Sequence, residues 1–189
     1  RGTSFAIESA STLATPPSAS PRPRGASTSE CRSPTEAAGD LDLFTSLCPV
    51  NVLGEGAQGI IRGCALPPSG AVTHVIKEIR CVDSDDIDKK FAVAQVFVDF
   101  RSKHVVPYLA VMASRRSPPV VRVVMPYYAE RDLAELIRGR REPLTEFWIL
   151  SVALQLTQAL RDLHSRTPHY IVHGDVKPSN VMVINKGAQ

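Results

Sequence analysis

Apolar residues fall into short runs in the middle of the chain. "VNVLGEGAQGIIRGCAL" places a glycine cluster between two such runs, and "AVTHVIKEIRCV" adds a third. Further along, "VVPYLAVM" and "VVRVVMPYY" are separated by the turn sequence "SRRSPP". Short apolar runs bounded by turn residues predict β-strands. We therefore expect these segments to be strands, with a glycine-rich connection between the first two.

One segment after the third strand carries apolar residues at helical spacing. Asp85 and Asp86 favour the start of a helix, because acidic residues interact well with a helix N-terminus. The apolar residues that follow at this spacing are Ile87, Phe91, Ala94 and Val98. We predict a helix here, with these four side chains on one face.

A second and longer helix is predicted over residues 145–164, with Thr145 as its N-cap. One face carries Ile149, Val152, Leu156, Leu160 and Leu163. The other face is also largely apolar, through Phe147, Leu150 and Leu154. A helix that is apolar on two faces is expected to be buried on more than one side.

Residues 1–40 have a different composition from the rest. Ser, Thr and Pro dominate residues 9–35, and large apolar residues are few. Such a segment cannot bury enough surface to offset the entropy of ordering it. We therefore predict a disordered Ser/Thr/Pro-rich tail over residues 1–40, followed by one folded domain over residues 41–189.

Composition and charge bear on whether the protein binds nucleic acid, crosses a membrane or uses its cysteines. A net charge of +3 does not by itself indicate nucleic-acid binding, and no apolar run is long enough to cross a bilayer. The four cysteines, at 31, 48, 64 and 81, form no C-x-x-C pair. They are expected to be reduced thiols in an intracellular, cytoplasmic protein, with neither nucleic acid nor membrane as a partner.

The glycine cluster Gly54, Gly56 and Gly59 forms a G-x-G-x-x-G pattern. Glycines let a backbone approach a polyphosphate closely and direct its N–H groups toward the anion. A dinucleotide-binding fold would place a helix after the glycines, whereas here a strand-like run follows. The pattern therefore favours a glycine-rich hairpin that lies above bound phosphates. Lys77, in the next strand, is costly to bury unless an anion meets it, which supports phosphate binding.

The octapeptide "HGDVKPSN", residues 173–180, follows the long helix. Asp175, Lys177 and Asn180 are spaced to converge from one short loop. An aspartate can accept a hydroxyl proton, a lysine can neutralise charge on a transferring phosphoryl group, and an asparagine can hold a metal ion. A polar turn after the helix would not explain this combination. The octapeptide therefore indicates phosphoryl-transfer chemistry.

Taken together, these motifs resemble the first part of a eukaryotic-type protein kinase domain. "GEGAQGII" resembles G-x-G-x-x-G-x-V, "VIK" resembles V-A-I-K, and "HGDVKPSN" resembles H-R-D-L-K-P-x-N of the Ser/Thr type. "VVMPYYAERDLAELI" resembles the hinge between the lobes and the helix after it. The resemblance implies an α+β, two-lobe fold: an antiparallel N-lobe with one helix over about 41–125, a hinge over about 126–131, and the start of a helical C-lobe over about 132–189.

The resemblance also implies ATP and Mg²⁺ as cofactors and a protein Ser/Thr hydroxyl as acceptor. Asp175 would be the catalytic base, Lys177 the stabiliser of phosphoryl charge, and Asn180 a magnesium ligand. Lys77 would contact the α- and β-phosphates of ATP. The ATP site would further include Gly54, Gly56, Gly59, Ile61 at the valine position, Met125 behind the adenine, Pro126 through its carbonyl and Tyr128 through its N–H.

The chain departs from the family pattern at four places. Gly174 replaces the arginine of H-R-D, and the bulkier Val75 replaces the alanine of V-A-I-K. Val93 falls where a helix glutamate should pair with Lys77, and Gln95 is the nearest polar residue. The sequence also contains no D-F-G. We therefore expect an incomplete kinase domain that is inactive by itself.

Two alternative functions stay open at this point. A pseudokinase or kinase-like binding module would account for the missing helix glutamate and D-F-G. A small-molecule phosphotransferase of the aminoglycoside or choline kinase type would account for H-G-D in the loop. The retained Lys77, Asp175, Lys177 and Asn180 favour an ATP-dependent Ser/Thr protein kinase over the first alternative. "KPSN" and the hinge sequence favour it over the second.

Overall fold

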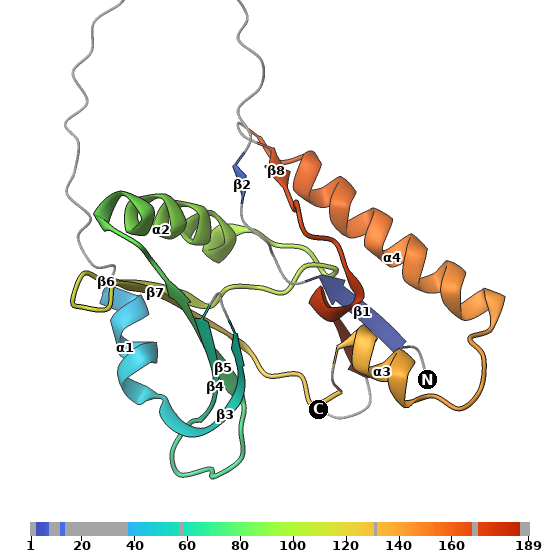
Figure 1. Ribbon diagram of the computed structural model, residues 1–189, viewed down its shortest axis with the longest axis horizontal. Helices are drawn as coiled ribbons and strands as arrows, with labels where there is room; N and C mark the ends of the chain where they lie inside the picture. Colours follow the sequence, from blue (N-terminus) through green and yellow to red (C-terminus); the bar gives the residue numbers. More distant parts are fainter. Residues whose placement is uncertain are drawn as a thin grey trace, which may run out of the picture.

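The computed structural model describes residues 3–7, 12–13, 38–56, 59–130, 132–167 and 170–185. A β-sheet with two helices is followed by a second region of helices and short strands (Figure 1). This α+β architecture, with its antiparallel sheet, agrees with the fold class that the resemblance implied.

The sheet contains five antiparallel strands in the order β3-β4-β5-β7-β6. The glycine segment joins β3 to β4 as a hairpin, as the sequence predicts. Valine and isoleucine are frequent in these strands because their branched side chains pack well on a pleated surface. The strands are β3 (Cys48–Gly56), β4 (Gly59–Ala65), β5 (His74–Arg80), β6 (Ala110–Ser114) and β7 (Val120–Pro126).

Helices cover both faces of this sheet. Helix α2 (Ser84–Asp99) has Asp83 as its N-cap and packs against the face that carries Val75 and Val123. Helix α1 (Ala38–Ser46) covers the opposite face. Leu43 and Phe44 of this helix, and Leu47 directly after it, pack in a cluster with Ile76 and Val124. Side chains alternate between the faces of a strand, so β5, β6 and β7 each contribute to two separate cores. The sequence predicted α2 but not α1.

The second region follows β7 through residues 127–132. Helix α3 (Leu133–Gly139) is capped by Asp132, and helix α4 (Glu146–His164) is capped by Thr145 as predicted. Two short strands, β8 (Ile171–Val172) and β9 (Val181–Asn185), flank the loop that contains the octapeptide. The 3₁₀ turn η1 (Pro178–Asn180) ends that loop.

The predicted disordered tail is wrong for part of residues 1–40. Strand β1 (Thr3–Ile7) pairs antiparallel with β9, and β2 (Thr12–Leu13) pairs with β8. Strand β1 gains backbone hydrogen bonds, and its Ala6 and Ile7 side chains are buried in a core, which offsets the entropy of ordering the strand. Helix α1 also begins at Ala38, inside the predicted tail. Residues 8–11 and 14–37 lie outside the described residues.

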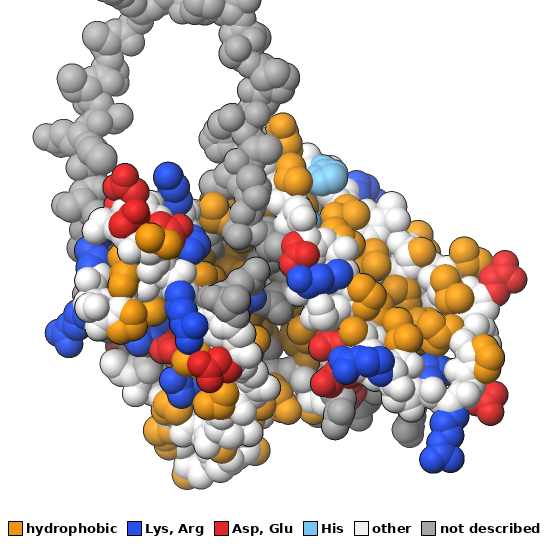
Figure 2. Space-filling view, viewed as in Figure 1, with side chains coloured by type: hydrophobic (Ala, Val, Ile, Leu, Met, Phe, Trp, Pro, Cys, Tyr) orange, Lys and Arg blue, Asp and Glu red, His pale blue; other side chains and the backbone are white. Residues whose placement is uncertain are grey.

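Helix α4 is buried on one side only, which corrects the prediction for its second face. Val152, Ala159 and Leu163 are buried. Ile149, expected on the buried face, is half exposed. Phe147, Leu150 and Leu154 are 83%, 59% and 60% exposed. Figure 2 shows apolar side chains gathered along α4. In the described part of the chain, no helix combines the length and apolar character that a membrane span requires.

Candidate active site

The glycine hairpin lies at the end of β3 and β4. Gly56 pairs with Gly59, and Gly54 pairs with Ile61. A Cβ atom added to Gly54 or Gly56 would have no neighbour within 4 Å, so both glycines face open space. Gly59 differs, because its φ is +147° and a Cβ there would lie 1.7 Å from the Glu78 carbonyl oxygen. The packing of β4 against β5 therefore requires a glycine at this position.

Lys77 lies in β5, opposite Ile61 of β4 and Val123 of β7. Its strand is central in the sheet, so its backbone position is fixed from both sides. The helix facing this surface, α2, contains no glutamate. Its ion-paired aspartates contact other cations: Asp86 binds Lys90 at 2.8 Å, and Asp88 binds Arg115 at 2.6 Å. Helix α2 thus lacks the glutamate that the family pattern pairs with Lys77.

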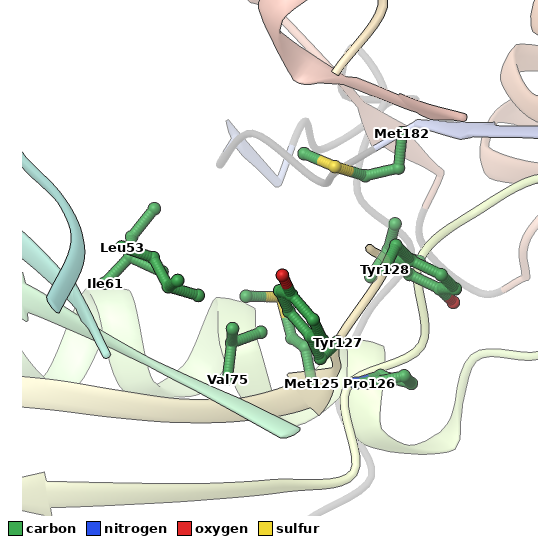
Figure 3. Close-up of a pocket in the computed structure, with 9 residues that line it drawn as sticks. Leu53, Ile61, Val75, Met125, Pro126, Tyr127, Tyr128 and Met182 are labelled. Carbon is green, nitrogen blue, oxygen red and sulfur yellow. The ribbon is translucent and has the colours of Figure 1, made fainter. Parts of the chain in front are cut away.

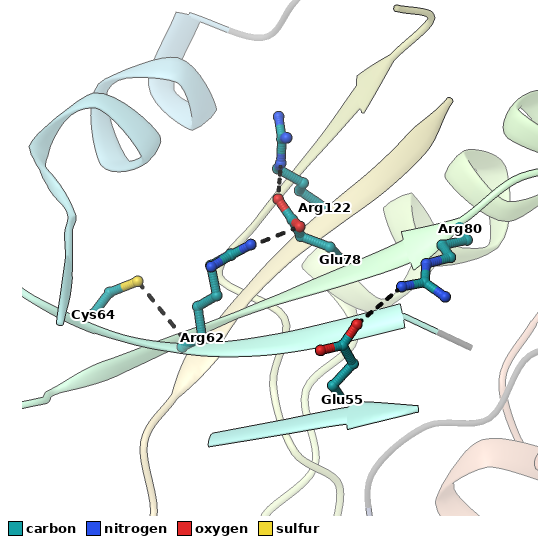
Figure 4. Close-up of polar contacts among 6 residues, drawn as sticks. All are labelled: Glu55, Arg62, Cys64, Glu78, Arg80 and Arg122. Atoms are coloured by element: carbon teal, nitrogen blue, oxygen red, sulfur yellow. Dashed lines mark hydrogen bonds and ion pairs between the residues drawn. The ribbon is translucent and has the colours of Figure 1, made fainter. Parts of the chain in front are cut away.

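The opposite face of β5 carries a row of ion pairs (Figure 4). The carboxylate of Glu78 is 2.7 Å from Nε of Arg122 and 3.7 Å from Nε of Arg62, which joins three neighbouring strands. At the hairpin end, Arg80 donates to Glu55 at 3.2 Å. These contacts hold the glycine hairpin and β4 against the strand that carries Lys77.

An apolar cavity of about 130 Å³ opens below the sheet. Figure 3 shows Leu53 and Ile61 on one side of it, with Met182 and Tyr128 facing them. The full lining is Leu53, Ile61, Val75, Val106, Met125, Pro126, Tyr127, Tyr128 and Met182. A cavity with apolar walls, bordered by backbone groups of an extended segment, suits a flat aromatic ligand.

Three residues of this cavity lie at the end of β7 or directly after it. Pro126 has no N–H and can offer only its carbonyl to a ligand. The backbone N–H of Tyr127 donates to the Thr73 carbonyl at 3.0 Å, which fixes the segment against the sheet. Burial raises the pKa of the Tyr128 phenol, so this side chain stays neutral. Tyr128 therefore contributes an uncharged side chain to the cavity wall.

The octapeptide loop brings three predicted residues into contact. Nζ of Lys177 lies 2.7 Å from Oδ2 of Asp175. The Asn180 amide Nδ2 donates to the same carboxylate oxygen at 3.0 Å and to the Asp175 carbonyl at 2.8 Å. Because both contacts of Asn180 use its nitrogen, its Oδ1 is the atom that suits a hard cation.

These contacts set the charge state of Asp175. The hydrogen bond from Lys177, and then that from Asn180, lower the pKa of this carboxyl group. Hydrogen bonds and a nearby positive charge both favour the ionised form. Asp175 is therefore a stable carboxylate, able to accept a hydrogen bond from a hydroxyl group.

His173 and Gly174 shape the backbone before Asp175. His173 is 2% exposed, and its Nδ1 accepts from the Asp175 N–H at 3.2 Å. Gly174 has φ of +73°, a left-handed conformation that costs other residues roughly 1–2 kcal/mol. Glycine at the arginine position of H-R-D thus lets the backbone turn without strain, directing Asp175 toward Lys177 and Asn180.

Some of the residues that line the cavity were among those predicted from the sequence. Of the predicted ATP-site residues, Ile61, Met125, Pro126 and Tyr128 line the cavity, while Gly54, Gly56, Gly59 and Lys77 lie in the strands above it. Val75 also lines the cavity, at the position where its bulk was noted. The residues that sequence reasoning missed are Leu53, Val106, Tyr127 and Met182. The proximity of Leu53 to Gly54 and of Met182 to Asn180 in sequence was an available signal.

Comparison with known proteins identifies the same region. Residues 49–188 match the model of the protein kinase domain. Mouse serine/threonine-protein kinase Nek2 is 30% identical over 141 residues, covering 71% of this chain and 31% of Nek2. Serine/threonine-protein kinase cst-1 of Caenorhabditis briggsae is 28% identical over 138 residues, covering 73% of this chain and 26% of that protein. The chain thus spans about a third of the length of these curated relatives, or less.

Proposed function

Because the chain belongs to the protein kinase family, we propose that it serves in ATP-dependent transfer of the γ-phosphoryl group to a protein Ser/Thr hydroxyl. The observation that carries this proposal is the contact of Asp175, Lys177 and Asn180 within one loop, next to an apolar cavity under a glycine hairpin. Together, these features would supply a nucleotide site and the groups that act on the reacting phosphate.

The nucleotide is proposed to lie between the sheet and β9. Its adenine ring would fill the apolar cavity, with the Pro126 carbonyl as acceptor and the Tyr128 N–H as donor. The phosphates would pass under Gly54, Gly56 and Gly59 toward Lys77. Open space at Gly54 and Gly56 supports this, because close approach of a backbone to phosphates needs an absence of side chains.

Asp175 is proposed to hold the acceptor hydroxyl. A carboxylate with a lowered pKa is a weak base, so its main contribution is to orient the hydroxyl toward the phosphate and to accept its proton late. Lys177 has three N–H donors, of which the Asp175 contact uses one, and this leaves capacity for a phosphoryl oxygen. Together they place attacking oxygen and charge stabilisation in one loop.

The donor set of the loop fits Mg²⁺. The amide oxygen of Asn180 is the atom that would hold the ion, since its nitrogen bonds Asp175. Bound magnesium would supply positive charge that offsets the charge of the phosphate oxygens. The orientation of Asn180 is a property of this chain, set by the two hydrogen bonds to Asp175.

A nucleotide-binding module without transfer activity is the second candidate. The absence of any glutamate in α2 favours it, because active members of the family pattern carry a glutamate in this helix. The two candidates make different predictions about chemistry but the same prediction about ATP binding.

Nucleotide binding and transfer should be measured together on the natural protein. The proposal predicts Mg²⁺-dependent phosphorylation of a Ser/Thr peptide and its loss in Lys77→Met, with Lys103→Met as a matched control that retains activity. ATP binding without phosphorylation in the wild type would contradict transfer and favour the binding module. Absence of ATP binding would contradict both candidates.

A further inference from the structure

The N-terminal segment pairs with both strands that flank the octapeptide loop. Strand β2 pairs with β8 through Thr12↔Val172 and Leu13↔Ile171, directly before the loop. Strand β1 pairs along the whole of β9, from Ile7↔Val181 to Thr3↔Asn185, directly after it. Figure 1 shows β1 beside α4 and β9, although β1 is far from both in the sequence. The loop that holds Asp175 and Asn180 thus lies between two strands, β8 and β9, and each of them pairs with a strand from residues 3–7 or 12–13.

Ile7 also connects the second region of the fold to the five-stranded sheet region. Its backbone N–H donates to the His104 carbonyl at 2.9 Å, and its carbonyl accepts from the Val106 N–H at 3.0 Å. Val106 lines the apolar cavity, and His104 lies in the same loop between α2 and β6. One edge of Ile7 therefore bonds the loop of the sheet domain while its strand pairs with β9.

The side chains of this strand complete a core between the two regions. Ala6 is 2% exposed and Ile7 is 0% exposed. They belong to the same hydrophobic cluster as Val105 and Val106, which lie between α2 and β6. Leu163 of α4 and Ile171 of β8 belong to it as well. Burying an isoleucine side chain contributes substantially to stability, so the segment is held by packing as well as by pairing. Removing it would leave a cavity between the two regions.

We propose that residues 3–7 and 12–13 act as an inter-lobe clasp, a pair of strands supplied in cis by the same chain that positions the octapeptide loop under the sheet. The edge of β9 pairs with an extended segment. That segment needs a small residue at the position of Ala6 and a branched apolar residue at the position of Ile7. The clasp concerns structure and not chemistry, so it stands or falls separately from the proposed kinase activity.

Disulfide trapping in the full chain tests the register. Thr3→Cys with Asn185→Cys joins directly opposed residues, whose separation suits a disulfide. Ser4→Cys with Asn185→Cys is the matched control, because adjacent residues point to opposite faces of a strand. Peptide mapping by mass spectrometry should find an intramolecular bond in the first pair and little in the second. Equal trapping in both pairs, or mainly intermolecular bonds, would overturn the clasp in cis.

Amide hydrogen exchange tests the positioning role. Ile7→Asp should place a charge in the core and raise exchange in β8 and β9 by about tenfold or more, while β7 amides keep their protection. Val82→Asp is the control, since Val82 is 86% exposed. Unchanged protection of β8 and β9 in Ile7→Asp would overturn the role. If Ile7→Asp unfolds the whole chain, Ile7→Ala replaces it, with the same contrast between β9 and β7 required.

Discussion

At the scale of single residues, the two ends of the candidate site use glycine for different reasons. Gly54 and Gly56 face open space, whereas Gly59 is confined by the backbone of β5 and Gly174 by its own left-handed conformation. Only the first kind leaves room for a ligand, and the second kind holds the protein backbone itself. A single motif such as G-x-G-x-x-G can therefore combine functional and structural requirements.

Substitution within the glycine motif separates these requirements. Gly59→Ala should lower the free energy of unfolding by about 2–3 kcal/mol, because its Cβ would overlap the Glu78 carbonyl and its φ is unfavourable for alanine. Gly54→Ala should change it by less than about 0.5 kcal/mol. Urea denaturation of both variants is the measurement. Equal destabilisation would show that the β4–β5 contact does not constrain Gly59.

The charge of Asp175 should depend on Lys177. In Lys177→Ala the pKa of the Asp175 carboxyl should rise toward the ordinary aspartate value, because the largest cause of its lowering is removed. The folded-state pKa is lowered, so the stability contributed by this carboxylate is present above the pKa of the unfolded chain and lost as the pH falls through the folded-state pKa. Carboxyl NMR titration measures the shift, with Lys103→Ala as a control. An unchanged Asp175 titration in Lys177→Ala would rule out the ion pair as its cause.

At the scale of elements, β5 is the strand on which the site is built. One of its faces presents Val75 and Lys77 to the site, and the other presents Glu78 to two arginines. Pairing on both edges and ion pairs on the outer face fix its position. The geometry of the candidate site thus depends on contacts that no ligand would touch.

The partly buried and exposed ion pairs of this sheet should differ in strength. Glu78→Ala should cost about 1–2 kcal/mol, because Glu78 is only 18% exposed and its loss leaves two arginines unpaired. Glu55→Ala should cost less than about 0.5 kcal/mol, since both Glu55 and Arg80 are more than half exposed. Thermal denaturation at low and high salt checks both. A larger effect of Glu55→Ala would contradict this order.

Pattern and motif predicted most of the central elements. The strands β3 to β5, helix α2 and helix α4 with its Thr145 cap follow from periodicity and capping, which are local properties of the sequence. The N-terminal strands were missed because their partners lie more than 150 residues away (172 − 12 = 160). Long-range pairing leaves no local signal when the segment sits beside a Ser/Pro-rich stretch.

At the scale of the whole molecule, α4 presents an exposed apolar patch on the face that Figure 2 shows. Phe147, Leu150 and Leu154 lie on successive turns, and an apolar patch of this kind promotes association. We expect concentration-dependent self-association of the chain and its reduction in Phe147→Glu/Leu154→Glu. Size-exclusion chromatography with light scattering measures it, with Val82→Glu as a control. A sharp wild-type monomer at all concentrations would refute this expectation.

The central claim is that Asp175 serves phosphoryl transfer and not nucleotide binding, and the Asp175→Asn variant of the natural protein tests it most directly. Asparagine keeps the shape of the side chain but removes the basic oxygen. Turnover in a radiolabelled phosphoryl-transfer assay should fall by about 10²–10⁴, roughly 3–5 kcal/mol, while ATP affinity measured by calorimetry changes by less than about threefold. Turnover of Asp175→Asn close to that of the wild type would contradict the assignment of the octapeptide loop as catalytic.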